Sequence, residues 1–474
     1  MKRRLISIFL ASLVFLAGSI PPSSVRAETP SAGPTYIVQE GDSLWSIAQR
    51  FDVNISDLEA INNLSDPTIY IGEKLVIPGL EGLSGTLVFE PVQYGQTLRS
   101  LARQYHVDES VLRKINHIVS PAELYAGYSL TLLQQDNQSY WTTRAGLDKG
   151  ETLLELAVQQ KTDPWTLAQF NELSGTWDAL PGDALYLPAD KSTTASTGLP
   201  PAFISTQVDA LPIVQGTTVQ VKVVSSQSVA LGGLLLNHPL HFYSAGDNSF
   251  VALQGIEADA NPGLYPLQLD ATLPDGSIQS FQQMVPVVSG NYPHDATIYY
   301  VKPDTIDPQV TGPDADKVRA LTAASTPDKY WQGQFTSPAS VYASQTFISS
   351  PFGIGRSYIG IGTTLKLETY HTGMDYAGGT GQPITAPAAG IVVFTGPLVV
   401  CGNATYIYHG WGVYSGICHQ SAIKVTVGQM VHQGDLIGLV GDTGRALGPN
   451  LHWEVWVNGV QVNPTQWLSE SYPH

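Results

Sequence analysis

The chain has 474 residues, of which 43% are hydrophobic and 13% are charged, and its formal net charge is −17 at pH 7. This composition excludes a disordered or membrane-embedded chain. A chain of this length is too long to fold around a single hydrophobic core, so we expect several domains. The acidic charge argues against nucleic acid as a partner, because a phosphate backbone would be repelled.

The N-terminus has the pattern of an export signal. Basic residues 2–4 precede an apolar run over residues 5–18, and residues 25–27 fit a small-residue cleavage site. The run is short for a membrane-spanning helix, and no cysteine follows it to carry a lipid anchor. We therefore expect residues 1–27 to be a signal peptide, with an uncleaved anchor as the alternative. Cleavage would leave a secreted chain with no stable membrane span and a net charge of −21.

Three copies of one pattern occupy the next part of the chain. The segments GDSLWSIAQRFDV, GQTLRSLARQYHV and GETLLELAVQQKT begin 54 and 55 residues apart, and an Asn and a Gly follow each in the same register. Each copy indicates a strand, a glycine turn, two short helices and a closing strand, which is a βααβ unit. The repeated residues are Gly41, Gly95 and Gly150, then Asn62, Asn116 and Asn171, then Gly72, Gly127 and Gly182.

This unit resembles the lysin motif (LysM), a module that binds GlcNAc-containing glycans such as peptidoglycan. The resemblance is close over residues 35–79, in YIVQEGDSLWSIAQRF and INNLSDPTIYIGEKLVIPG, and looser over 86–133 and 139–188, two degenerate repeats. It implies that the sugar lies between the loop after the first strand and the loop before the last. In the first copy these loops contribute the expected glycan-binding residues Gly41, Asp42, Ser43, Leu44, Ile69 and Tyr70.

The later copies depart from the first at two positions of this loop and helix. We expect the first copy to bind glycan, and the alternative is that these loop residues only hold the turns. For the second and third copies, a structural role and weakened binding both remain open. The replacements are Gln96 and Glu151 for Asp42, and Arg99 and Leu154 for Trp45.

The middle of the chain carries no recognisable chemistry. Residues 191–201 form a Ser/Thr/Pro linker, and short alternating runs over 203–290 predict an all-β, immunoglobulin-like sandwich that serves as a spacer. His238 and His241 lie there without clustered carboxylates and are expected to be ordinary surface histidines. Residues 291–344 mix proline turns with one helix, and we expect a connecting arm.

Candidate metal ligands gather in the last third of the chain. His371 and Asp375 form an HxxxD pattern, which the neighbouring glycines make better suited to an extended turn than to a helix. His452 lies on the strand LHWEVWV, whose alternate apolar residues predict a face in the core, and His419 ends the strand GVYSGICH. Two histidines and one aspartate are a plausible zinc set that leaves a fourth position for water, as a hydrolytic zinc needs.

Four segments of this region resemble the lysostaphin-type zinc endopeptidases (metallopeptidase family 23). FISSPFGIGRS, YHTGMDYAGGTGQPITAPAAGIVVFTG, VTVGQMVHQGDLIGLVGDTG and GPNLHWEVWVNGVQVNP follow one another within residues 345–470 in the family's order. The resemblance implies a mostly antiparallel β domain of the duplicated hybrid motif type. It also implies zinc ligands at His371, Asp375 and His452. His419 matches the catalytic histidine that polarises the water or stabilises the tetrahedral intermediate.

Asn450 departs from that family pattern, which has a catalytic histidine at this position. An amide can donate a hydrogen bond to a developing oxyanion, but it cannot take a proton at neutral pH. Loss of a general base costs roughly 10²–10⁴ in rate, unless His419 or Glu454 assumes the role. Glu454 shares the face of His452, and it is either the hydrogen-bond partner of that ring or a solvated strand carboxylate.

Cys401 and Cys418 are the only cysteines. In an exported protein such a pair suggests a disulfide, and two free buried thiols are the alternative. The segment between them indicates two strands around residues 409–412, which would bring the cysteines roughly opposite each other.

Together these features predict a secreted, wall-associated zinc endopeptidase. It would bind the glycan strands of peptidoglycan through its LysM repeats and hydrolyse the stem or cross-bridge peptides with a zinc-activated water. The alternative is a catalytically impaired pseudo-peptidase that acts as a wall-binding scaffold or as an activator of another hydrolase. A third interpretation, a glycan-binding protein without chemistry, leaves the C-terminal third unexplained.

Overall fold

The chain divides into two compact units, one ending at Leu87 and the other beginning at Val88, and each is described by itself. The signal peptide expected at residues 1–27 lies outside the residues that the structure describes. Across the described part of the chain, no helix is both long and apolar enough to cross a membrane. In this computed structural model the described residues are 33–135, 143–187, 198–341 and 348–474.

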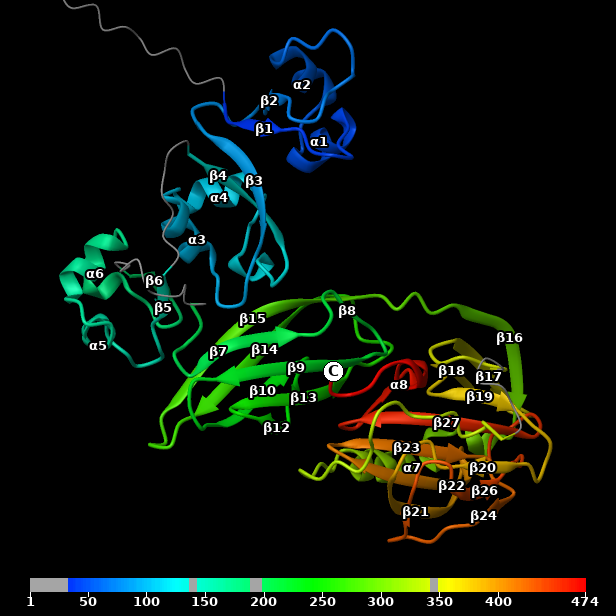
Figure 1. Cartoon of the computed structure of the whole chain (residues 1–474). Coiled ribbons are helices and arrows are strands. Elements are labelled where there is room, and N and C mark those ends of the chain that lie inside the picture. Colours follow the sequence, from blue (N-terminus) through cyan, green and yellow to red (C-terminus); the bar gives the residue numbers. More distant parts are fainter. Residues whose placement is uncertain (1–32, 136–142, 188–197, 342–347) are drawn as a thin grey trace, which may run out of the picture. The chain divides into compact units, whose positions relative to one another are not determined.

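The first unit contains a small βααβ domain, as the repeat pattern predicts (Figure 1). Its first helix begins with a capping box, in which Ser43 and Ser46 satisfy each other's backbone N–H groups. Asn62 follows the second helix and donates to the carbonyls of Leu58 and Val76, each at 2.8 Å, while its own oxygen accepts from the Val76 N–H at 2.7 Å. This side chain therefore joins the helix to the closing strand. The elements are β1 (Thr35–Ile37), α1 (Leu44–Phe51), α2 (Ile55–Ile61) and β2 (Lys74–Val76).

The same construction recurs twice at the start of the second unit. Asn116 and Asn171 make the same three hydrogen bonds as Asn62. The glycines repeated at the two turns of every copy have φ between 82° and 88°, which explains why glycine recurs there. The second copy has β3 (Thr86–Pro91), α3 (Leu98–Tyr105), α4 (Glu109–Ile115), η1 (Pro121–Glu123) and β4 (Ser129–Gln134). The third has β5 (Arg144–Gly146), α5 (Leu153–Gln159), α6 (Pro164–Phe170), η2 (Thr176–Asp178) and β6 (Ala184–Tyr186).

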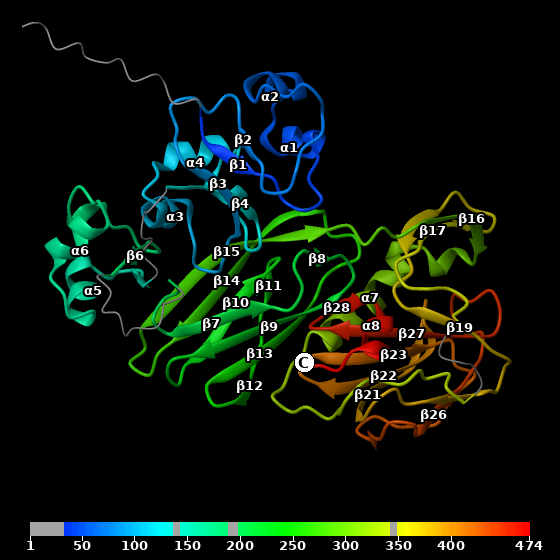
Figure 2. The same ribbon diagram turned by 45° about the horizontal axis from the view of Figure 1, so that its top comes forward.

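The next strands form two sheets around one apolar core (Figures 1 and 2). Val221 from one sheet and Leu267, Leu269 and Val285 from the other are fully buried there. The immunoglobulin-like form expected for this region stays a prediction. One sheet has the order β11 (His238–Pro239), β10 (Ala230–Leu235), β14 (Gly263–Thr272), β15 (Ile278–Val288) and β8 (Ile213–Val214). The other has the order β12 (Phe242–Gly246), β13 (Ser249–Gly255), β9 (Thr218–Ser225) and β7 (Phe203–Val208).

This two-sheet region shares a core with the C-terminal domain. Tyr243 and Leu253 belong to the same buried cluster as Trp411, and the rings of Tyr243 and Trp411 stack with their centroids 4.8 Å apart. Trp467 of the C-terminal domain donates its indole N–H to the Thr218 hydroxyl at 2.9 Å. Because such contacts bury large aromatic side chains, this region packs firmly against the C-terminal domain, and its role as a spacer stays a prediction.

The segment expected to be a connecting arm is also built into the C-terminal domain. β16 pairs in parallel with β17, and Val318 of α7 is buried in a cluster with strands of the C-terminal sheet. Trp331 and Phe335 fill the main core of that domain. Burial of these apolar side chains is the physical reason why the segment is folded onto the domain. The elements are β16 (His294–Val301), η3 (Pro303–Thr305) and α7 (Pro308–Thr322).

The C-terminal domain is built on a seven-stranded sheet in the order β19-β27-β23-β22-β21-β25, with β28 beside β27 (Figure 1). Along β27 the expected alternation is present, since Leu451, Trp453 and Val455 are fully buried in the main core while His452 and Glu454 face the other side. The duplicated hybrid motif type stays a prediction. The strands of the sheet are β19 (Met374–Ala377), β21 (Gly390–Leu398), β22 (Gly402–Gly410), β23 (Val413–Cys418), β25 (Met430–Val431), β27 (Asn450–Val457) and β28 (Val460–Val462). The remaining elements are β17 (Gly355–Gly360), β18 (Lys366–Tyr370), β20 (Pro383–Thr385), β24 (Ala422–Ile423), β26 (Leu436–Leu439) and α8 (Pro464–Ser469).

Cys401 and Cys418 form a disulfide with a Cα–Cα distance of 4.8 Å. β22 and β23 pair antiparallel between them, as the sequence predicts, so the two cysteines meet at the open end of the hairpin. The disulfide therefore closes this hairpin next to His419, the residue that follows β23.

Candidate functional site

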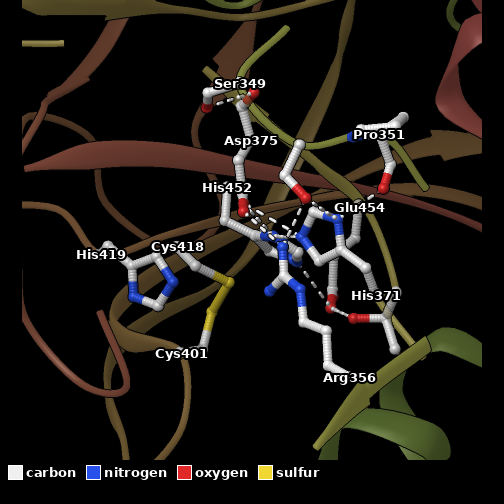
Figure 3. A network of polar contacts seen from close by, with 12 residues as sticks. Ser349, Pro351, Arg356, His371, Asp375, Cys401, Cys418, His419, His452 and Glu454 are labelled. Atoms are coloured by element: carbon white, nitrogen blue, oxygen red, sulfur yellow. Dashed lines mark hydrogen bonds and ion pairs between the residues drawn. A yellow bond between two sulfur atoms is a disulfide. The ribbon is translucent and has the colours of Figure 1, made fainter. Parts of the chain in front are cut away.

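Three side chains from neighbouring strands converge on one point. Asp375 on β19 lies directly opposite His452 on β27, and His371 follows the end of β18. Asp375 Oδ1 lies 2.8 Å from His452 Nδ1 and 3.1 Å from His371 Nε2, and the two ring nitrogens are 3.0 Å apart (Figure 3). All three residues are buried. The structure thus brings together the three metal ligands expected from the sequence.

The outer contacts of the two rings fix which nitrogens face inward as bases. His371 Nδ1 lies 2.8 Å from the Pro351 carbonyl, so Nδ1 carries the proton and Nε2 presents a lone pair. His452 Nε2 faces Glu454 Oε1 at 3.3 Å, so its Nδ1 presents a lone pair as well. Two imidazole lone pairs and a carboxylate oxygen then point at one another with no hydrogen between them. Such a set could hold a metal ion, and two nitrogens with one carboxylate suit zinc.

Glu454 is the partner of His452, and the alternative of a solvated strand carboxylate is wrong. The residue is buried, and burial would raise its pKa, but hydrogen bonds from His452 and other donors lower the pKa below its usual value. Its carboxylate accepts hydrogen bonds from Thr372 at 3.0 Å, Tyr406 at 3.2 Å, Trp456 at 2.9 Å and Gln461 at 2.8 Å. A carboxylate held by four donors stays ionised and keeps the ring of His452 in place.

Arg356 neutralises the outer oxygen of Asp375, and sequence reasoning missed this residue. Its guanidinium donates to Asp375 Oδ2 at 3.0 Å and to the Ser350 hydroxyl at 2.6 Å (Figure 3). When no metal is bound and a proton takes the central position, burial opposes ionisation of Asp375, but the ring nitrogens of His371 and His452 beside it hold its pKa well below the usual range. Arg356 lies within the segment FISSPFGIGRS, but only the pairing of β17 with its neighbours brings it to the site.

Without a metal, a proton is the only cation that can fill the centre. Burial disfavours a charged imidazole, but the carboxylates of Asp375 and Glu454 outweigh this effect and raise the pKa of His452 to about 9. Burial lowers the pKa of His371. In the absence of a metal, His452 is thus the charged ring and His371 the neutral one.

His419 lies beside this centre, and its Nε2 has no hydrogen-bond partner within the described part of the chain. Its backbone N–H donates to the Cys401 carbonyl at 2.7 Å, and its Nδ1 donates to the Thr443 carbonyl at 2.7 Å. The centroids of the His419 and His452 rings are 5.9 Å apart. Burial, with a smaller contribution from His452, lowers the pKa of His419 to about 4. Its Nε2 is therefore an unprotonated base at neutral pH.

Asn450 lies at the start of β27 and lines the same cavity as His419. Its backbone N–H donates to the Gly441 carbonyl at 3.0 Å, which fixes the position of the residue. Its Oδ1 is buried and has no hydrogen-bond partner among the described residues. A buried polar atom without a partner is costly unless a ligand or water completes it, so this amide is available to a bound molecule.

The cavity over this site has a volume of about 370 Å³ and draws its walls from three parts of the chain. Asp295 and Tyr299 come from β16, in the segment that the sequence analysis treated only as a connector. Arg445 comes from the loop before β27, and Tyr358 from β17. No local sequence signal marks these residues, because only the pairing of β16 with β17 brings the first two to the cavity.

In the first LysM copy, three of the six expected glycan-binding residues serve mainly to hold the fold. Asp42 accepts from the Tyr36 hydroxyl and forms an ion pair with Arg50, Ser43 caps α1, and Leu44 is buried. Gly41 and Tyr70 are exposed, Tyr70 by 70%, and Ile69 is half-buried. Of the six residues, Tyr70 therefore presents the one exposed aromatic ring.

The second copy uses the equivalent positions for packing. Tyr125, which corresponds to Tyr70, forms a bridge with Met284 of β15, and the Gly95 N–H donates to Gln283 at 3.3 Å. Arg99, which replaces Trp45, forms ion pairs with Asp178 and Asp183 of the third copy. Both loops of this copy's groove therefore contact the two-sheet region. In the third copy, by contrast, the exposed large side chains include Leu154, Trp177 and Leu180.

Comparisons with known proteins agree with the description of the C-terminal domain and with that of the three repeats. Residues 369–464 match the model of peptidase family M23, and residues 36–78, 92–132 and 148–188 match the model of the LysM domain. The chain thus contains an M23 peptidase domain and three LysM domains.

Curated relatives match over the M23 region. The chain is 44% identical over 119 residues to the DD-carboxypeptidase/endopeptidase Mpg of Neisseria meningitidis, a match that covers 25% of this chain and 26% of that protein. It is 42% identical over 93 residues to the peptidoglycan DD-endopeptidase ShyA of Vibrio cholerae, covering 20% of this chain and 22% of that protein. The match therefore spans about a quarter of these relatives' length. Among solved structures, the catalytic domain of lysostaphin from Staphylococcus simulans is 28% identical, with a TM-score of 0.21 and coverage of 21% of this chain and 80% of that one.

Proposed function

We propose that the chain is a zinc endopeptidase of the bacterial cell envelope that binds peptidoglycan through its LysM domains and hydrolyses the peptide cross-links. The observation that carries the proposal is the convergence of His371 Nε2, Asp375 Oδ1 and His452 Nδ1, three basic atoms within 3.1 Å of one another. The match to the M23 family over the same residues supports it.

His371, Asp375 and His452 would hold the zinc ion. A bound zinc supplies a water whose pKa falls toward about 7 and polarises the peptide carbonyl. Glu454 and the Pro351 carbonyl keep the two imidazole rings in the tautomers that present lone pairs. Arg356 balances the charge of Asp375, so that one carboxylate oxygen stays directed at the centre.

Proton transfer falls to His419, because Asn450 cannot take a proton. His419 Nδ1 is committed to the Thr443 carbonyl, which leaves Nε2 as the acceptor, and the low pKa keeps that atom unprotonated at neutral pH. The Asn450 side chain lines the cavity and can donate its amide N–H to the oxyanion of the tetrahedral intermediate. In this proposal His419 is the base and Asn450 is the hydrogen-bond donor to the oxyanion.

Asn450 also supports the second candidate function, a catalytically impaired pseudo-peptidase that acts as a scaffold or activator. In that case the ligand cluster would still bind zinc, while hydrolysis would be lost for want of a second histidine. The four donors on Glu454 and the ion pair on Asp375 favour the enzyme, since a site without chemistry gains nothing from holding its ligands so closely.

Export and wall binding complete the proposal. Removal of a signal peptide at residues 1–27 would place the chain in the periplasm or outside the cell, where the disulfide is stable. The first and third LysM copies expose large side chains at the candidate glycan grooves. The proposed domain order is LysM repeats at 35–79, 86–133 and 139–188, then the sheets at 203–290, the arm at 291–344 and the peptidase domain at 345–470.

A single comparison tests the proposal. Release of new amine groups from purified peptidoglycan should be zinc-dependent for the wild type and absent for Asp375→Ala. Asn450→His restores the family pattern and should raise the rate, and His419→Ala should abolish it. If the wild type releases nothing and only Asn450→His is active, the pseudo-peptidase function holds. If His419→Ala keeps full activity, the role given to His419 is wrong.

A further inference from the structure

A second guanidinium lines the active-site cavity, and it has no carboxylate partner. The Arg445 guanidinium lies over the ring of Tyr358, 4.5 Å from its centroid, and donates to the Thr305 carbonyl at 3.2 Å. Across the part of the chain that the structure describes, no Asp or Glu oxygen lies within 4.0 Å of it. Arg445 thus differs from Arg356, which shares the cavity but is paired with Asp375.

The carboxylates that line the cavity are already committed elsewhere. Asp375 faces the ligand cluster and Arg356, and Glu454 accepts from its four donors and faces His452. Asp295 accepts from the Tyr299 hydroxyl and from the Thr297 N–H. A partly buried cation without a counterion is unfavourable, so the cavity is built to receive an anion at Arg445.

The backbone holds Arg445 in a fixed position relative to the reacting groups. Its N–H donates to the Val400 carbonyl at 2.8 Å, next to the disulfide at Cys401. The same loop supplies the Thr443 carbonyl that orients His419. The loop therefore holds Arg445 in place and orients His419, and both side chains line the same cavity.

We infer that Arg445 binds a free carboxylate of the peptide substrate and so selects peptides that carry a carboxylate near the bond that is cut. This inference rests on the proposed function, because it places a peptide in this cavity. A planar guanidinium offers two parallel N–H groups to a carboxylate, and the Tyr358 ring holds that plane in position. A neutral side chain of similar length would keep the shape of the wall and lose the charge.

Two sources of this carboxylate are chemically equivalent at Arg445. One is the carboxylate on the residue that supplies the leaving amine, as in a terminal D-alanyl-D-alanine. The other is a carboxylate on the acyl side, as in a γ-linked glutamate. Conversion of one carboxylate at a time into a carboxamide distinguishes the two sources, since the amide keeps the size and removes the charge.

The experiment uses the zinc-loaded full chain and the peptide L-Ala–γ-D-Glu–L-Lys–D-Ala–D-Ala, whose two free carboxylates are the glutamate α-carboxyl and the C-terminus. Two matched peptides carry a carboxamide at the C-terminus or at the glutamate α-carboxyl. For the wild type, kcat/KM should fall ~10-fold or more for one of the two amides, and that amide identifies the source. Arg445→Gln should cleave the acid and that amide at equal rates. Arg319→Gln, on the exposed face of α7, should keep the wild-type preference.

Equal cleavage of all three peptides by the wild type would overturn the inference, as would an Arg445→Gln variant that still prefers the acid. If the wild type cleaves none of them, the proposed function fails on this substrate, and calorimetric binding of the same peptides then decides the inference alone. The acid should bind the wild type ~10-fold more tightly than the sensitive amide, and Arg445→Gln should show no difference.

Discussion

Asp375 and His452 face each other across the β19–β27 pair, with Asp375 Oδ1 2.8 Å from His452 Nδ1. The opposite nitrogen of the same ring faces Glu454, so His452 lies between two carboxylates. Asp375 directs its carboxylate at the same central point as the ring nitrogen Nδ1 of His452. Glu454 contacts the other ring nitrogen, Nε2, and so fixes the tautomer of the ring. This arrangement is the structural basis of the proposed metal site.

Glu454→Gln should weaken zinc binding without removing a ligand. The amide keeps the size of the carboxylate but cannot hold the charge that orients the His452 ring, and loss of such a partner costs roughly 10–100-fold in metal affinity. Competition with a chromophoric chelator measures the affinity directly. Glu368→Gln, at a largely exposed position on β18, is the matched control and should bind zinc as the wild type does. Unchanged affinity in Glu454→Gln would show that the ring is held by packing alone.

The ligand set and the strand around it could be predicted because each has a local pattern. HxxxD and the alternation of LHWEVWV place donors on a face, and zinc chemistry needs that combination of side chains. Glu454 could not be resolved from the sequence, because its burial depends on Tyr406 and Trp456 from the surrounding sheet. Arg356 was missed because an isolated arginine has no periodic signal.

In the LysM repeats as well, features that depend on contacts within one copy could be predicted, and features that depend on distant contacts could not. The recurrence of Asn62 and its counterparts predicted the repeat, since each side chain joins elements within its own copy. The packing of the second copy against the two-sheet region could not be predicted, because the backbone at Tyr125 forms a bridge with Met284, more than 150 residues away in the chain. Contacts of that separation leave no trace in a local pattern.

The protein should lose stability as the pH falls below about 6.5, and His409 contributes to this loss. Burial lowers the pKa of His409 to about 4, and its ring lies between the Ala389 carbonyl and the Ser415 hydroxyl. An unfolded histidine has a pKa of about 6.5, so the folded state favours the neutral ring. The stabilisation is fully present above pH 6.5 and is lost as the pH falls toward 4, by about 3 kcal/mol in total.

Urea unfolding at a series of pH values measures this effect. His409→Gln cannot titrate, so its free energy of unfolding should depend less steeply on pH between 6.5 and 4 than that of the wild type. His432→Gln alters a ring whose side chain is 80% exposed and should keep the wild-type dependence. An unchanged slope in His409→Gln would mean that another group governs the acid sensitivity.

The disulfide should stabilise the protein and hold the loop of His419. Replacement of both Cys401 and Cys418 by serine opens a loop with a sequence separation of 17, which costs about 3 kcal/mol in the chain-entropy description. The free energy of unfolding should fall by that order in the double variant. Reductant should lower the stability of the wild type to a similar extent and leave the double variant unchanged. Equal stability of the wild type and the double variant would show that β-sheet pairing alone closes the hairpin.

Glycan binding should depend on the first LysM copy and not on the second. Tyr70 is 70% exposed at the candidate groove, and its ring is open to a sugar, whereas the backbone at the equivalent Tyr125 forms a bridge with Met284 of β15 and its ring packs edge-on against Tyr128. Tyr70→Ala should therefore weaken binding of the full chain to purified peptidoglycan by several-fold, as loss of an aromatic contact of about 1 kcal/mol predicts. Sedimentation with insoluble peptidoglycan measures the bound fraction.

Tyr125→Ala is the matched comparison, because it removes the same side chain at the same position of the repeat. It should lower the free energy of unfolding, because the Tyr125 ring packs edge-on against Tyr128 with ring centroids 5.1 Å apart, and it should leave glycan binding unchanged, because the backbone of this loop is bridged to β15. Trp177→Ala tests the third copy, whose indole is 76% exposed, and it should weaken binding if that copy is used alongside the first. A loss of binding in Tyr125→Ala equal to that in Tyr70→Ala would show that the second copy binds glycan in spite of its contact with β15.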